Sequence, residues 1–354
     1  MRFSSRLERS GDNTPACRAK TFHSWVSRAL VALVVTAAVA ALMASWPDVR
    51  GELAAADPGW LALASLCAVG NILAAAGAWR AALDALGSPV PARPAVAIFC
   101  VGQLGKYLPG SVWPVVVQAQ LSSRRGVPPE HVVLAGALAL TEAVVVSLAL
   151  GLTAVPSIIE AADVPGETPV LLAVVVAVVA AGLVVGLSPR LVAPVIRALL
   201  RVTRRPPLTA PLTRGGLGAV LGWAALSVAL LGAHGAALAA AVGLSWPVAV
   251  AAASANALAQ LAGLLAVPVP AGLGVREAVL VAVMAPVAPL PAALAMAVLS
   301  RLLRTAADLA TAGLARAALG RAAPGHATTP ATAIAPTPPK ERCLTRDTLR
   351  SWRR

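Results

Sequence analysis

The sequence predicts an all-α protein: a polytopic bundle of membrane helices with about six full spans and two re-entrant, broken-helix hairpins in an inverted repeat. Composition is the first reason, because 58% of the 354 residues are hydrophobic and 12% are charged, whereas soluble domains are about 45–50% apolar and about 25% charged. The second reason is a set of long apolar segments. The third is a pair of segments in which proline, glycine and charge interrupt an apolar stretch.

Six segments are long and apolar enough to cross a bilayer, which takes about 20 helical residues for about 30 Å of hydrocarbon. Tryptophans lie near the ends of several, as indole rings at the headgroup level do; Trp60 and Trp79, for example, bracket the second segment. The predicted spans are 28–46, 60–79, 132–155, 169–187, 217–242 and 292–314.

Charge in the connecting segments predicts the orientation. Arginine and lysine gather in the N-terminal tail, between the second and third spans, in 188–216 and after the last span, whereas the remaining loops are acidic. Because Lys/Arg-rich loops face the cytoplasm, we expect both termini to be cytoplasmic in a multi-pass protein of the cell (plasma) membrane. The net charge of +14 then reflects this bias, and no nucleic-acid partner is expected.

The chain divides into three predicted parts. A basic cytoplasmic tail at 1–27 precedes a transmembrane domain at 28–320. The remaining segment, 321–354, is rich in Thr, Pro, Ala and Arg and has no apolar period, which predicts a disordered cytoplasmic tail.

Two interrupted segments, 94–121 and 248–285, remain between the spans. Proline cannot continue a helix, and irregular backbone at membrane depth survives only where protein or a cavity surrounds it. The flanking charges predict that the first hairpin enters from the cytoplasm and the second from the opposite face, as in inverted-repeat transporters. The predicted hinge residues are Pro109, Gly110, Pro268, Pro270, Gly272 and Gly274.

Seven charged residues fall within the apolar regions. A charge at the bilayer centre costs about 2.5–3.5 kcal/mol on insertion scales, so such residues usually face the protein interior and pair. Arg301, Arg304 and Asp308 recur at helical spacing on one face of the last span. Arg304 and Asp308 are four residues apart and can pair along the helix. The set is Lys106, Glu142, Arg276, Glu277, Arg301, Arg304 and Asp308. Glu142 stands alone on its span, so we expect its partner to be a basic residue from another segment, above all Arg301 or Arg304.

Lys106 and Arg276 lie beside the two breaks and are the candidates for binding a lipid phosphate. Unpaired N–H groups at a helix start favour anions, and a guanidinium adds bidentate recognition of phosphate. Lys106 offers a point charge next to the Tyr107 hydroxyl. The alternative is that all seven charges close into structural ion pairs.

Catalytic and metal-binding patterns are missing from the sequence. The four cysteines have no metal-like spacing, and no Ser-His-Asp set or phosphate-cradling glycine loop is present. His131 and His234 are interpreted as packing residues, with a proton relay as the alternative. We therefore expect a protein that is not an enzyme and needs no metal or cofactor.

The segments Lys106-Tyr-Leu-Pro-Gly-Ser-Val-Trp113 and Pro268-Val-Pro-Ala-Gly-Leu-Gly-Val-Arg-Glu277 resemble the lysylphosphatidylglycerol synthase transmembrane-region family. The resemblance implies a flippase-like module with re-entrant helices over roughly residues 25–320, and supports the charged and hinge residues of both segments as site positions. Some members carry a soluble aminoacyltransferase domain, which we do not expect in this chain because the segment after the last predicted span is short. Many also carry an arginine or acidic residue where Ser111, Val112, Trp113 and Gln118 occur here.

The leading functional hypothesis is translocation of a phosphate-bearing lipid or lipid-linked carrier between leaflets. The expected partners are membrane lipids, either anionic or linked to polyprenyl phosphate. Two alternatives stay open: a non-catalytic accessory subunit of a separate lipid or glycan transferase, and a proton-coupled small-molecule permease that uses Glu142 or Asp308.

Overall fold

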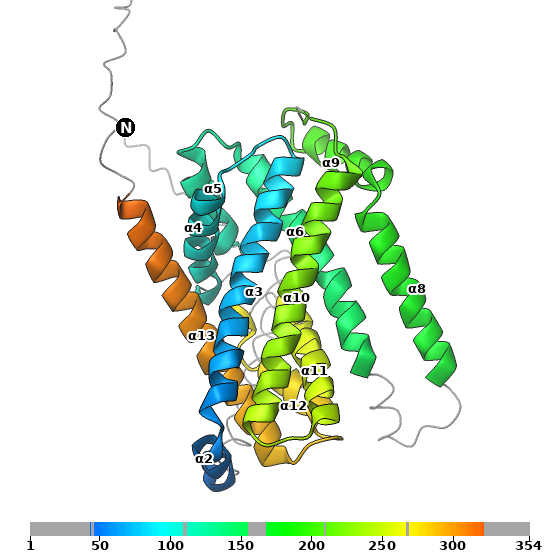
Figure 1. The fold of residues 1–354 in the computed structure, drawn as a ribbon. Helices are drawn as coiled ribbons and strands as arrows, with labels where there is room; N and C mark the ends of the chain where they lie inside the picture. The colour runs from blue at the N-terminus through cyan, green and yellow to red at the C-terminus, as the bar shows by residue number, and fades with distance from the viewer. Residues whose placement is uncertain are drawn as a thin grey trace, which may run out of the picture.

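The structure is a computed structural model that describes residues 43, 46–108, 112–154, 168–208, 210–266 and 269–321. All regular structure within these ranges is helical (Figure 1), which confirms the predicted all-α membrane bundle. The tail at 1–27, nearly all of the predicted span at 28–46 and the tail after 321 lie outside the described residues.

Among the described residues, five helices are long and apolar enough to cross a membrane alone, and a bent pair raises the number to six. A multi-pass membrane protein is thus confirmed. Four of the helices match predicted spans, and the bent pair, α8 (Thr168–Gly186) and α9 (Pro189–Val202), turns by 68° at its break. The four are α3 (Pro58–Ala85), α6 (Pro129–Gly151), α10 (Arg214–Ala241) and α13 (Leu290–Arg321).

Helices α3 and α10 lie side by side through the middle of the bundle (Figure 1). Asp57 caps α3 by accepting hydrogen bonds from the N–H groups of Gly59 (2.7 Å) and Trp60 (3.0 Å). The two helices are joined by Asn71, whose Nδ2 donates to the backbone oxygen and the hydroxyl of Ser227, both at 2.8 Å. Close packing with hydrogen bonds between the helices is typical of helix pairs in membranes.

Two helical hairpins enter the bundle from opposite ends, as predicted (Figure 1). The first is α4 (Ala92–Gln103), η1 (Leu104–Tyr107) and α5 (Trp113–Ser123), and the second is α11 (Trp246–Leu265), η3 (Pro270–Gly272) and α12 (Val275–Met284). Their tips, η1 and η3, are in contact. The second hairpin differs from the expectation because α11 alone is long enough to span. The internal repeat of the two halves stays a prediction.

The break of the second hairpin depends on left-handed backbone. Gly272 and Gly274 have φ of 63° and 81°, values that glycine adopts without steric cost. Ala271, with φ of 51°, is a non-glycine residue in the same region and is strained. Pro270 begins η3, whereas Pro268 and the other predicted hinge, Pro109-Gly110, lie outside the described residues.

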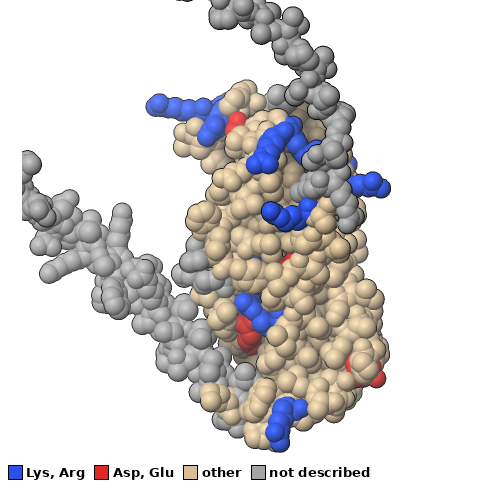
Figure 2. Space-filling model, turned by 90° about the vertical axis from the view of Figure 1, so that its left-hand side faces the viewer, with Lys and Arg blue, Asp and Glu red and all other residues tan. Residues whose placement is uncertain are grey.

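Basic side chains gather at one end of the bundle, the upper end in Figure 2, with little blue at the other. Helix α9 lies at this end (Figure 1) and is amphipathic. Arg190, Arg197 and Arg201 share one of its faces, while Leu191 and Val195 expose apolar surface on another. Such a helix fits the headgroup region of a leaflet, and the cytoplasmic location of this end stays a prediction.

Candidate functional site

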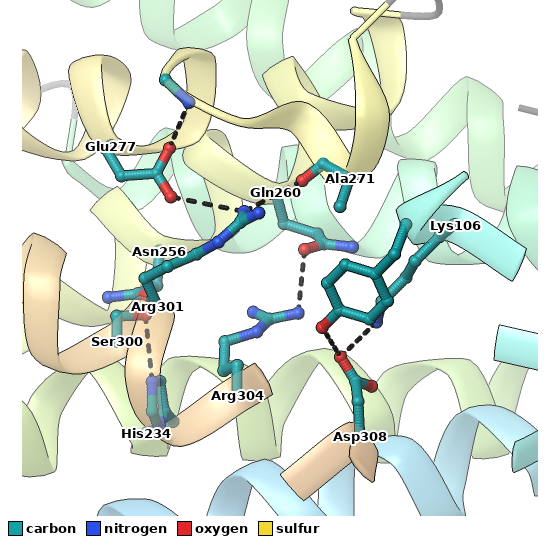
Figure 3. A network of polar contacts seen from close by, with 12 residues as sticks. Lys106, His234, Asn256, Gln260, Ala271, Glu277, Ser300, Arg301, Arg304 and Asp308 are labelled. Atoms are coloured by element: carbon teal, nitrogen blue, oxygen red, sulfur yellow. Dashed lines mark hydrogen bonds and ion pairs between the residues drawn. The ribbon is translucent and has the colours of Figure 1, made fainter. Parts of the chain in front are cut away.

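A narrow cavity lies where the two hairpin tips meet α13, and six of the seven predicted intramembrane charges line it. Figure 3 shows five of the six, all but Arg276. Helix α13 supplies three from one face, because their spacing repeats close to the helical period. The others come from η1 and from the first turn of α12. The six are Lys106, Arg276, Glu277, Arg301, Arg304 and Asp308.

Asp308 joins the first hairpin to α13. Its Oδ2 lies 2.6 Å from the Lys106 ammonium and accepts a hydrogen bond of 2.7 Å from the Tyr107 hydroxyl. The carboxylate is 5% exposed, so two donors on one oxygen offset its desolvation. The expected pairing of Arg304 with Asp308 along α13 is wrong, because the tip of η1 brings an amine and a phenol to that carboxylate instead.

Glu277 and Arg301 join the second hairpin to the same helix. Glu277 Oε2 accepts a hydrogen bond of 2.7 Å from the Gly274 N–H, which caps the start of α12. Its Oε1 lies 3.4 Å from Arg301 Nη1, which also donates to the Ala271 carbonyl at 3.2 Å. Arg301 therefore holds the strained residue of the break in place.

Arg304 is only partly satisfied by the described residues. Its Nη2 donates to Gln260 Oε1 on α11 at 3.0 Å. Its Nη1 is buried and has no hydrogen-bond partner in the described part of the chain. A buried donor without a partner costs free energy, so this nitrogen is available for an acceptor that enters the cavity.

Arg276 lies in the first turn of α12, as predicted. Within the described ranges no carboxylate lies within ion-pair distance of its guanidinium. Its aliphatic stem runs over Gly263 of α11 and Gly272, and a Cβ at Gly263 would collide with it. The two glycines thus form a groove that aims the guanidinium into the cavity.

His234 adjoins this network (Figure 3) and is fully buried. Its Nδ1 is 2.8 Å from the Ala64 carbonyl and its Nε2 is 3.1 Å from the Ser300 hydroxyl, which in turn donates to Asn256 Oδ1 at 3.4 Å. Both ring nitrogens have partners, as the packing interpretation expects. His131 likewise has a partner, the Ser88 hydroxyl at 2.7 Å from its Nδ1.

The structure places Glu142 outside this site. The predicted pairing with Arg301 or Arg304 is wrong, since those arginines face the hairpins and bond there. The Glu142 carboxyl is fully buried, and neither oxygen has a hydrogen-bond partner among the described residues. It lies against Gly186 at the end of α8.

Sequence reasoning missed the neutral polar lining of the cavity. Asn256 on α11 and Ser300 on α13 line the cavity, and Gln260, four residues after Asn256, accepts a hydrogen bond from Arg304, which is four residues after Ser300. Polar residues at i, i+4 in otherwise apolar helices share a face, and this spacing could have revealed them.

The charges of the cavity do not balance. Four cationic side chains face two carboxylates, so the cavity has an excess of positive charge and is suited to an anion. Among the described residues, no group of three or more His, Cys, Asp or Glu is placed to hold a metal ion.

Comparison with known proteins agrees with the architecture. No curated protein sequence matches the chain. The family model "Lysylphosphatidylglycerol synthase TM region" matches residues 29–311, which include both hairpins and the cavity between them. Since this match covers most of the chain, the protein belongs to the lysylphosphatidylglycerol synthase TM region family.

Proposed function

We propose that the protein moves a phosphate-bearing lipid, or a lipid-linked carrier, between the two leaflets of the cell membrane. The observation that carries this proposal is the excess of cations where the hairpin tips meet, inside a bundle of membrane helices. Burying such an excess is costly unless an anion joins it. A lipid phosphate is the anion that is present at both leaflets.

The two arginines are the strongest candidates to bind the phosphate. Arg276 is at the start of α12, where the helix dipole also favours an anion, and Arg304 keeps a buried Nη1 for an acceptor. Lys106 and Tyr107, the other predicted phosphate ligands, contact Asp308 in this state. They would become ligands only after that contact opens.

The two ion pairs provide a means of alternating access. Lys106–Asp308 ties the first hairpin to α13, and Glu277–Arg301 ties the second hairpin to the same helix. A phosphate that competes for Lys106 or Arg301 would release one hairpin at a time. Because the hairpins enter from opposite ends (Figure 1), each release would open the cavity toward a different leaflet.

Reconstitution tests the proposal. In proteoliposomes, wild-type protein should speed the movement of a fluorescent anionic phospholipid between leaflets, and Arg276→Gln should slow it by about tenfold or more, as removal of a charged contact costs about 1.5–3 kcal/mol. Arg316→Gln changes an exposed arginine of the same helix α13 outside the cavity and should keep the full rate. Equal rates for empty and protein-containing liposomes across anionic and glycosylated lipids would exclude the proposal.

Orientation has its own test. In a background without the native cysteines, Glu52→Cys should react with an impermeant thiol reagent added outside intact cells, whereas Arg125→Cys should not. Both side chains lie outside the predicted spans: Glu52 in an acidic connecting segment and Arg125 in a basic one. External labelling of position 125 would reverse the proposed topology.

A further inference from the structure

Glu142 is the one intramembrane charge of the predicted set that has no place in the lipid site. Its side chain is fully buried, and both carboxyl oxygens lack a partner among the described residues. An ionised carboxylate in that position would pay the full cost of desolvation, and such a group takes up a proton instead. A buried carboxyl group without a partner is favoured in its neutral, protonated form.

The elements packed on α6 supply no charge to it. The described parts of α8, α11, α5 and η2 contain no Asp, Glu, Lys, Arg or His. On α3, Arg80 and Asp84 pair with each other at 3.5 Å. On α10, Arg214 is at the basic end and His234 is bonded to Ala64 and Ser300. On α6 itself, Glu130 pairs with Arg205, and His131 bonds to Ser88.

Helices α6 and α8 pack closely against each other beside this acid, and we call their contact the α6–α8 seam. Gly182 and Gly186 are four residues apart on α8; a Cβ at the first would press on Val145, and one at the second would collide with the Glu142 carboxyl. Gly186 is also the last residue of α8, so the negative end of that helix dipole lies beside the acid and disfavours its ionisation. Helix α8 lies at the edge of the bundle and packs mainly on α6 (Figure 1).

We propose that Glu142 is a proton-binding site that couples lipid movement to proton flow through the position of α8. The protonated acid allows α8 to lie against α6. When the O–H bond breaks, the proton passes to water at the loosened seam, the carboxylate keeps the electron pair, and repulsion and hydration move α8 and the adjoining α9 outward. The coupling part rests on the proposed function, whereas the proton site stands on its own geometry.

Infrared spectroscopy tests the proton site without any transport. Wild-type protein in a detergent without ester groups, whose carbonyls would overlap the signal, should at neutral pH show the carbonyl stretch of a protonated carboxyl, and the band should fade as the pH is raised. Glu142→Gln should remove it. Glu130→Gln removes a glutamate from the same helix that is ion-paired and should leave the band unchanged. A wild-type spectrum without the band, or a band that survives in Glu142→Gln, would overturn the proposal.

Transport tests the coupling. A gradient of one pH unit is a tenfold ratio of proton activity, worth about 1.4 kcal/mol, so imposing it across wild-type proteoliposomes should change the lipid flux by up to about tenfold. Glu142→Gln, and Glu142→Met if the amide fails to fold, should give the same flux with and without the gradient. A variant that still responds to the gradient would refute the coupling. An infrared band in a protein that moves no lipid would leave the proton site standing and refute the lipid function.

Discussion

The hairpin junction and the α6–α8 seam both bury ionisable groups, but they do so in opposite ways. At the junction, carboxylates and cations come from the three elements η1, α12 and α13, and both carboxylates have two donors each. At the seam, one carboxyl group lies against Gly186, and neither of its oxygens has a hydrogen-bond partner among the described residues. At the junction, pairing stabilises the buried charges. At the seam, the lack of a partner favours the neutral form of the acid over the charged one.

The comparison separates two kinds of function for buried polar groups. A paired network can exchange partners, so a ligand of the right charge can enter it and shift the equilibrium between its arrangements. A lone acid has no partner to exchange and responds only to protons. A transporter that uses both would recognise its cargo at the junction and sense the proton at the seam.

Breaking the network should have the largest effect. Asp308→Asn would leave the Lys106 ammonium and the Tyr107 hydroxyl without their carboxylate, and removal of one member of such a buried pair costs about 3–5 kcal/mol. We expect a clear drop in melting temperature in detergent. The double variant Lys106→Met with Asp308→Leu should recover most of the loss, because an apolar pair needs no counter-charge. Strict additivity of the two changes would rule out their direct pairing.

Filling the seam should have a smaller effect. At Gly186→Ala the added methyl group would overlap the Glu142 carboxyl, and overpacking of this kind costs about 1–3 kcal/mol. Gly222→Ala, in α10, is the matched control because a Cβ there meets nothing within 4 Å. Its stability should be unchanged or slightly raised, since alanine favours a helix over glycine. Equal melting temperatures for the two variants would mean that α8 does not pack closely on Glu142.

Composition and helical spacing were enough to predict much of this molecule. Long apolar segments predicted the spans because a bilayer demands length and hydrophobicity, and closely spaced prolines and glycines predicted where the second hairpin turns. The shared face of Arg301, Arg304 and Asp308 also followed from the 3.6-residue period. Each of these properties is local in sequence, so a window of residues carries it.

The choice of partners was not local and could not be read in the same way. Asp308 has an arginine four residues before it, yet it bonds to Lys106 and Tyr107, about 200 residues earlier in the chain. That choice depends on how far the tip of η1 reaches toward α13. Glu142 was expected to find an arginine because a lone charge needs one. It instead lies where two glycines admit α8 closely, and there the acid can remain neutral.

Arg276→Gln should have the smallest effect on the stability of the lipid-free protein and the most selective effect on ligand binding. The described residues give Arg276 no ion pair, so its removal breaks no salt bridge and relieves repulsion from Arg301 and Arg304. The melting temperature without lipid should stay near that of the wild type.

Anionic lipid raises the stability of the wild type in proportion to its binding, by about 2.7 kcal/mol at a concentration 100 times its dissociation constant, and the variant should lose most of this gain. Arg276→Lys should keep part of it, because the charge survives but the bidentate fork does not. A large loss of stability in Arg276→Gln without lipid, together with an unchanged response to lipid, would make Arg276 a structural residue. The charges of the junction would then form a structural network and not a ligand site.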